Sequence, residues 1–242
     1  MVKRPEKLPE NTGPENTGRE SPGKTEVDAF LAKLTATPPP ARGRGRLIFA
    51  MDATASREPS WAQACRIQSE MFTATAALGG LEVQLVFYRG FDECKASGWL
   101  SNADALVRRM MAVHCLGGQT QLGKLLSHAA REAAKHKVGA LIFVGDCMEE
   151  DIDAVCARAG ELGLLGVPAF MFHEGHDPVA ARAFQQIAKL TGGAYCRFDA
   201  SSADQLKRLL GAVAAYVAGG AVALDDYGRR TGVTLQLAGR RA

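Results

Sequence analysis

An unbroken apolar run that ends in a carboxylate places the strongest constraint on the fold of this chain. Residues 47–51, LIFAM, are all apolar, and Asp52 follows them directly. A run without polar alternation is typical of a β-strand buried on both faces, as in a parallel sheet covered by helices on both sides. In open parallel sheets, ligands bind at the carboxyl ends of the strands. The sequence therefore predicts a parallel sheet with a candidate binding site at Asp52.

The central part of the chain alternates between apolar strands and helices with short connections. The further predicted strands are residues 81–90, 91–99, 138–145, 167–175 and 194–198. The predicted helices are residues 59–78, 101–112, 121–136, 149–164, 178–191 and 202–218. The link at residue 90 is too short for a crossover, so residues 91–99 are predicted to form an antiparallel edge strand. The pattern indicates an α/β fold, with a mostly parallel sheet and helices on both faces.

The two ends of the chain differ from this central part. Residues 1–45 form a Pro/Gly-rich tail that contains a tandem PENTG repeat at residues 9–18, and we expect it to be disordered apart from a short amphipathic helix near residues 25–34. That helix would either pack back on the domain or dock a partner. Residues 46–220 are expected to form the folded domain. Residues 221–242 would be a C-terminal extension, in which residues 231–237 alternate like a strand.

Charge and cysteine content argue against several classes of protein. The net charge of +3 comes from residues 1–46, which hold nine Lys/Arg and six Asp/Glu, and the remainder has twenty of each. We therefore expect no basic surface for nucleic acid. Six scattered cysteines and a polar start favour a reduced, cytoplasmic protein. No run approaches the ~18–20 apolar residues of a membrane span.

Polar residues in three loops at the edge of the predicted sheet could together hold a cation. The first loop holds Asp52, Thr54 and Ser56, the second holds Thr120, and the third holds Asp146. If strands 47–52 and 138–145 are neighbours, both aspartates project into one crevice, where their charges repel and are costly to desolvate. A divalent cation removes that conflict, and carboxylate and hydroxyl oxygens suit a hard ion such as Mg²⁺.

Each of the three loops also has an explanation as ordinary helix capping. Ser56 could serve the helix that starts near residue 59, and Thr120 is a natural N-cap for a helix that begins at residue 121. Asp146 with Glu149 fits a capping box. The three loops taken together favour the metal site over three separate caps.

These residues resemble the metal-ion-dependent adhesion site of the von Willebrand factor A domain family, whose motif is D-x-S-x-S with a distant Thr and a distant Asp. The GVP segment before the fifth strand and IAKLTGGAYCRF before the last also match, so the resemblance covers about residues 46–218. It implies a doubly wound six-stranded sheet of order 3-2-1-4-5-6 with one antiparallel edge strand. Two positions depart from the family pattern. Thr54 replaces the first Ser, and Cys147 stands where a small Gly is more usual, so it would crowd or tune the site.

The resemblance implies a non-catalytic protein-interaction module. In the family, Mg²⁺ or Mn²⁺ bridges the domain to a Glu or Asp of a protein partner. The ion would then be held, in part through water, by Asp52, Thr54, Ser56, Thr120 and Asp146. Intracellular bacterial members often work beside ATPases or chaperones, which implies an adaptor role. By the same resemblance, helix 202–218 would shift when the site changes state.

Two enzymatic alternatives remain open. Residues 118–125, GQTQLGKL, fall one residue short of a phosphate-binding P-loop and would make the chain a nucleotide-binding protein. Leu125 lacks the hydroxyl that such a loop needs for Mg²⁺, and no clear strand precedes it. A hydrolase would need Ser56 or a cysteine beside a base. His173 and His176 flank the carboxyl end of a predicted strand and are the histidines to check.

Overall fold

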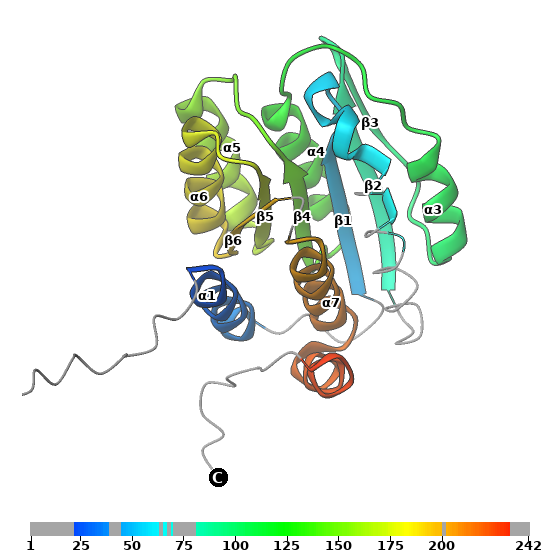
Figure 1. The fold of residues 1–242 in the computed structure, drawn as a ribbon, viewed down its shortest axis with the longest axis vertical. Helices are drawn as coiled ribbons and strands as arrows, with labels where there is room; N and C mark the ends of the chain where they lie inside the picture. The colour runs from blue at the N-terminus through cyan, green and yellow to red at the C-terminus, as the bar shows by residue number, and fades with distance from the viewer. Residues whose placement is uncertain are drawn as a thin grey trace, which may run out of the picture.

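A six-stranded sheet forms the centre of the protein in a computed structural model that describes residues 22–38, 45–62, 65, 66, 69, 81–199 and 202–232. The strand order is β3-β2-β1-β4-β5-β6 (Figure 1). The strands are β1 Gly45–Asp52, β2 Leu81–Arg89, β3 Glu93–Ala96, β4 Ala140–Gly145, β5 Ala169–Glu174 and β6 Tyr195–Phe198. The β2–β3 pair is antiparallel and the other four pairs are parallel. The predicted fold class, strand order and antiparallel edge strand are confirmed.

Helices cover both faces of the sheet. They are α1 Pro22–Ala36, α3 Ala103–Met111, α4 Leu122–Lys135, α5 Ile152–Leu164, α6 Pro178–Thr191 and α7 Ala203–Thr231, with a short 3-10 helix η1 at Ala55–Arg57. Residues 58–62, 65, 66 and 69 are also helical, and the rest of the predicted helix 59–78 lies outside the described residues. Buried side chains of α1, α3 and α7 form one core layer, and those of α4, α5 and α6 form the other.

The alternation of side chains along β1 determines which face of the sheet Asp52 is directed to. Phe49 and Met51 pack into the layer of α1 and α7, whereas Ile48 and Ala50 pack into the layer of α4 and α5. Successive side chains of a strand point to opposite faces, so Asp52 is directed toward the α4 and α5 side. The last residue of β1 therefore directs its buried carboxylate toward the side of the loops that precede α4 and α5.

Helix α1 is longer than predicted and packs back on the domain. It begins at Pro22, which suits the first turn of a helix, and extends to residue 36. Phe30 is 1% exposed, and its ring centroid lies 5.6 Å from that of Phe170 and 5.2 Å from that of Phe172. Helix α1 also contacts α7. The apolar face of this helix is thus covered by its own domain, which corresponds to the first of the two predicted roles.

Helix α7 continues beyond the predicted end at residue 218. A break with non-helical backbone at Gly219 and Gly220 separates its two halves. The second half packs against the first, because the Tyr227 hydroxyl donates a hydrogen bond to the Arg208 carbonyl oxygen at 3.2 Å. The prediction of a strand at 231–237 is wrong for Thr231, because this residue is the last of α7. Residues 233–237 of the predicted strand lie outside the described residues.

The apolar character of α7 reflects its place in the core. By length and composition this helix could cross a membrane, with a mean hydropathy of 1.4 in its most apolar window. More than half of that window is buried inside the protein, and the core helix of a soluble protein meets the same criterion. Burial against the sheet is therefore sufficient to explain the sequence of α7 (Figure 1).

Candidate metal centre

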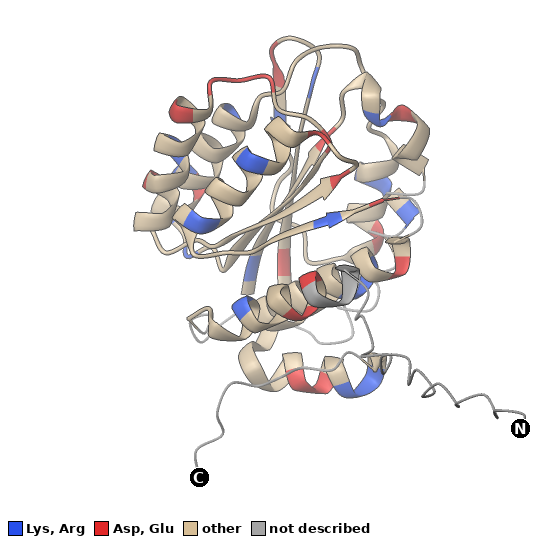
Figure 2. Ribbon diagram, turned by 60° about the vertical axis from the view of Figure 1, so that its left-hand side comes forward, with Lys and Arg blue, Asp and Glu red and all other residues tan. Residues whose placement is uncertain are grey.

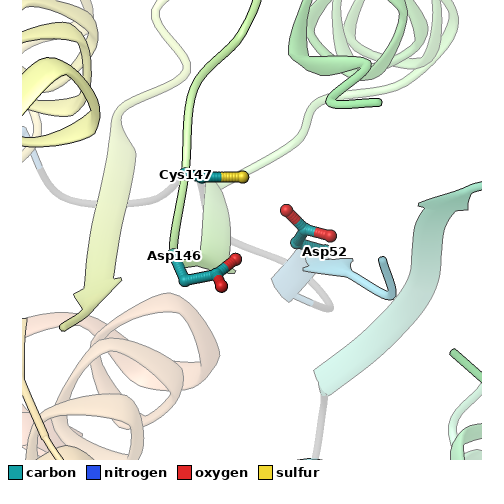
Figure 3. Close-up of side chains that lie close together, drawn as sticks. All are labelled: Asp52, Asp146 and Cys147. Carbon is teal, nitrogen blue, oxygen red and sulfur yellow. The ribbon is translucent and has the colours of Figure 1, made fainter. Parts of the chain in front are cut away.

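The carboxyl ends of β1 and β4 bring Asp52 and Asp146 together. The two strands are parallel neighbours with Met51 paired to Val144, so Asp52 at the end of β1 and Asp146 just after β4 lie at one edge of the sheet. Carboxylate oxygens of Asp52 and Asp146 and the sulfur of Cys147 all lie within 4.8 Å of one another (Figure 3). The two carboxylates therefore lie close together at one edge of the sheet.

Asp52 has a fully buried carboxylate that accepts hydrogen bonds from two donors. Its Oδ1 accepts from the Thr54 backbone N–H at 2.8 Å, and its Oδ2 accepts from the Tyr88 hydroxyl at 3.0 Å. Burial raises the pKa of Asp52, and the charge of Asp146 raises it further, while the bonds from Thr54 and Tyr88 lower it. Burial outweighs the hydrogen bonds, so the charged form of Asp52 is costly in the absence of a cation.

Thr54 and Ser56 do not act as helix caps. Thr54 stands at the N-cap position of η1 but makes no side-chain cap bond, and Ser56 lies inside η1. Their hydroxyl oxygens are instead 3.1 Å apart and hydrogen bonded to each other. The capping explanation is therefore wrong for this loop, and both hydroxyls stand directly beyond Asp52, at the edge where a ligand could reach them.

Thr120 is tied to the loop after β4 rather than to the start of α4. Helix α4 begins at Leu122, so Thr120 is not its N-cap. The Thr120 hydroxyl oxygen accepts from the Glu149 backbone N–H at 3.0 Å, and the Glu149 carboxylate accepts from the Thr120 backbone N–H at 3.0 Å. This reciprocal pair fixes the Thr120 loop against the loop that holds Asp146.

The acidic residues after Asp146 also accept hydrogen bonds from backbone N–H groups. Glu150 accepts from the N–H groups of Leu122 and Gly123 and so caps α4 from another loop. Asp151 is the N-cap of α5, since its Oδ1 accepts from the Ala154 N–H at 2.8 Å. The predicted capping box of Asp146 with Glu149 is therefore wrong, and the Asp146 carboxylate stays available to a ligand.

The segment that carries Thr120, residues 116–120, is hydrogen bonded to the ends of β1 and β2 and is called the strap below. The Leu116 N–H donates to the Ala53 carbonyl at 3.0 Å, and the Gln119 N–H donates to the Gly90 carbonyl at 3.1 Å. Gly118 packs so closely on Gly90 that a Cβ at residue 118 would lie 2.0 Å from the Gly90 carbonyl oxygen. The position of Thr120 therefore depends on a glycine that contributes no ligand.

The Gly118→Ala variant is expected to weaken metal binding by roughly tenfold, because displacing the strap moves the Thr120 hydroxyl and supporting groups of this kind are worth about 10- to 100-fold in metal affinity. Calorimetric titration with Mn²⁺ measures the effect. The matched control is Gly117→Ala, since a Cβ at residue 117 would meet nothing within 4 Å. Equal affinities of the two variants would show that the strap does not position the site.

The sequence analysis missed Arg57, a buried cation that lies beside the site. Its side chain is 1% exposed and forms an ion pair with Glu174 at the end of β5, where the Ser60 hydroxyl also donates at 3.1 Å. Strand β4 lies between β1 and β5, so this pair crosses the carboxyl end of β4, at Asp146. Burial lowers the pKa of Arg57, while the charges of Asp146 and Asp52 raise it. Arg57 thus balances part of the negative charge.

Two further observations concern the Asp146–Cys147 segment. The Asp146 Oδ1 is buried and has no hydrogen-bond partner among the described residues. Burial raises the pKa of the Cys147 thiol to about 12, with Asp146 and Asp52 adding to the effect, so the thiol is neutral in the absence of a cation. Buried polar oxygens are rarely left unpaired. The two carboxylates, the unpaired Oδ1 and the nearby hydroxyls together fit a divalent cation.

The P-loop interpretation finds no support in the structure. The Lys124 amine forms an ion pair with Asp92 and donates to Gln121, instead of standing free for a phosphate. Helix α4 begins within the 118–125 segment, and residues 112–121 before it form a loop rather than a strand.

The histidines flagged in the sequence belong to the core and the surface. His173 is fully buried, its Nδ1 lies 2.9 Å from the Tyr195 hydroxyl, and its ring packs edge-on against Phe184. His176 is exposed. The Ser56 hydroxyl is paired with Thr54, and no histidine among the described residues is hydrogen bonded to it.

Comparison with known proteins identifies the fold. No protein-family model matches the sequence, and no curated protein matches it. Among solved structures, the von Willebrand factor type A protein of Catenulispora acidiphila matches with a TM-score of 0.56 and 15% identity over 72% of this chain and 43% of that one. The SpRpn10 VWA domain matches with a TM-score of 0.55 and 12% identity, over 71% of this chain and 94% of that one.

A third match carries a metal in its site. Proximal thread matrix protein 1 from the mussel byssus, in a structure with a zinc-occupied MIDAS motif, matches with a TM-score of 0.58 and 16% identity over 73% of this chain. This chain spans 49% of that protein, and likewise less than half of the Catenulispora protein. The present protein therefore has a von Willebrand factor A-like fold, as the sequence motif predicted.

Proposed function

We propose that this protein is a non-catalytic interaction module that uses a divalent cation to bind an acidic side chain of a partner protein. The observation that carries the proposal is the convergence of Asp52 and Asp146 at one sheet edge, with the Asp146 Oδ1 buried and unpaired. When bound, the cation would supply an open coordination position for an outside carboxylate. The oxygen ligands taken alone would select Mg²⁺ or Mn²⁺.

The residues of the site would bind the ion, and their hydrogen bonds to one another hold them in position. Asp52 and Asp146 would supply the negative charge, and the hydroxyls of Thr54, Ser56 and Thr120 would complete the ligand set, directly or through water. Neutral hydroxyls add ligands without adding charge, which leaves the ion attractive to a partner carboxylate. The hydrogen bonds described above keep Asp52 and the three hydroxyls in place before a partner arrives, so little conformational entropy is lost there on binding.

The surroundings of the site support a protein partner. Phe91 and Leu116 are 77% and 51% exposed, and both lie at the same sheet edge, next to Gly90. Apolar side chains beside a charged site suit a protein interface. In the view of Figure 2, basic and acidic residues are interspersed over the helices, which gives no support to a nucleic-acid partner.

The proposed setting is the bacterial cytoplasm, where the resemblance implies an adaptor role beside an ATPase or a chaperone. All six cysteines are free, which supports a reducing compartment.

Affinity capture with the full chain tests this function. The protein is immobilised and exposed to lysate with Mn²⁺, with Zn²⁺, and with chelator, and the retained proteins are identified. We expect at least one protein to be retained only with a divalent cation and only by the wild type, and to lose binding when one of its Asp or Glu residues is replaced.

The matched variants are Asp52→Ala, which removes a buried carboxylate of the site, and Asp153→Ala, which removes an exposed carboxylate on α5. Asp153→Ala is expected to behave like the wild type. Retention of the same proteins by Asp52→Ala, or in chelator, would contradict the proposal.

A further inference from the structure

The ligand set at the sheet edge includes a sulfur atom. The Cys147 sulfur lies within 4.8 Å of carboxylate oxygens of both Asp52 and Asp146 and points into the same space as they do (Figure 3). A cysteine that only fills space would turn its sulfur into an apolar layer. Cys147 is only partly buried, forms no disulfide, and has no hydrogen-bond partner among the described residues. Its surroundings are therefore those of a ligand.

We propose that Cys147 is a third protein ligand of the ion, so that the site selects a thiophilic divalent cation, Zn²⁺ rather than Mg²⁺. The inference rests on the metal site of the proposed function and names the ion of that site.

The distances are compatible with one small ion. Zinc bonds of about 2.0–2.3 Å to oxygen and sulfur, at tetrahedral angles, place two ligands of the same ion about 3.3–3.8 Å apart. The three atoms, which lie within 4.8 Å of one another, need to close by about 1.5 Å at most. The Asp146 Oδ1, which has no other partner among the described residues, can make such a movement without losing a hydrogen bond.

The chemistry of the donors decides between metals. Mg²⁺ prefers six oxygens in a near-octahedral shell and gains little from sulfur, whereas Zn²⁺ readily takes a thiolate together with carboxylates. Zinc sites that are not purely structural commonly have three protein ligands and one open position. Asp52, Asp146 and Cys147 would be the three, and the hydroxyls of the site would then act through water. The open position is the one that a partner carboxylate would fill.

Three measurements on the full chain, freed of metal by dialysis against chelator, test the inference. Zn²⁺ affinity is measured by competition with a chromophoric chelator, and Mn²⁺ affinity by calorimetry. The third measurement is the absorption spectrum with Co²⁺, which shows a thiolate-to-cobalt charge-transfer band only if a sulfur binds the ion. The variants are Cys147→Ser, Asp52→Ala and, as a matched control, Cys156→Ser on α5, whose sulfur contacts Gln186 at 3.5 Å.

We expect Zn²⁺ to bind the wild type more tightly than Mn²⁺ does. Cys147→Ser should lower Zn²⁺ affinity by about 10- to 100-fold, leave Mn²⁺ affinity nearly unchanged and abolish the charge-transfer band. Cys156→Ser should retain both affinities and the band, which excludes a general effect of removing a thiol.

The contrary results separate the two proposals. If Cys147→Ser keeps the wild-type Zn²⁺ affinity while Asp52→Ala loses it, and the cobalt spectrum lacks the band, Cys147 is not a ligand and the metal site stands without it. If the wild type binds neither Zn²⁺ nor Mn²⁺, both the thiolate ligand and the proposed function are wrong.

Discussion

The Asp52→Asn variant is expected to be more stable than the wild type in chelator and to gain nothing from divalent cations. Burial raises the pKa of Asp52, so its charged form destabilises the metal-free folded state. Asparagine has the same shape, keeps an acceptor for the Thr54 N–H, and carries no charge. The wild type should gain about 2.7 kcal/mol at an ion concentration 100 times the dissociation constant, and the variant should gain none.

Thermal unfolding in chelator and in saturating Zn²⁺ or Mn²⁺ measures both effects. Because the folded-state pKa of Asp52 is raised above its ordinary value of 3.8, this group's penalty on metal-free stability should grow as pH rises from that value and level off above the folded-state pKa. The metal-free stability of Asp52→Asn should lack this dependence on pH. Asp153→Asn serves as the exposed control and should match the wild type. Cation stabilisation of Asp52→Asn equal to that of the wild type would place the ion elsewhere.

Replacing Arg57 with methionine is expected to lower the stability of the metal-free protein and to raise its affinity for divalent cations. The variant leaves Glu174 and the two aspartates without their buried counter-charge, and breaking such a pair costs about 3 kcal/mol. The same loss removes a positive charge that repels an incoming ion, so cations should bind several-fold more tightly. Urea unfolding in chelator and metal titration at low temperature measure the two effects.

The controls for Arg57 separate charge from packing. Arg57→Lys keeps the charge, so its cation affinity should stay near that of the wild type. Arg158→Met removes an arginine that is 52% exposed and paired with Glu161 on the surface of α5, and it should change neither quantity by much. A fall in cation affinity in folded Arg57→Met would mean that Arg57 supports the ion site instead of competing with it.

Much of the fold was predictable because its strands are short apolar runs with clear ends. The run 47–51 is hydrophobic on both faces and leads directly to Asp52, so both the strand and the candidate ligand followed from one segment. The brief link after β2 required a hairpin and hence an antiparallel edge. The full strand order depended on the resemblance, since local patterns do not state which strands are neighbours.

What the sequence analysis missed depends on contacts between residues far apart in the chain. The sequence analysis made no prediction for Arg57, because its burial depends on Glu174 at the end of β5, more than 100 residues further along the chain. The capping explanation of Thr120 failed for the same reason. Its partner Glu149 lies 29 residues away along the chain, and a short-range rule cannot find it. The second half of α7 followed two glycines that ordinarily end a helix.

The measurement that tests the metal-dependent site most directly is anomalous diffraction from crystals of the full chain grown with Mn²⁺ and, separately, with Zn²⁺. The site described above requires an anomalous peak at about 2.0–2.3 Å from carboxylate oxygens of both Asp52 and Asp146, with the Cys147 sulfur at bonding distance in the zinc crystal. An empty edge between β1 and β4 at saturating ion, or peaks only on surface residues, would contradict it.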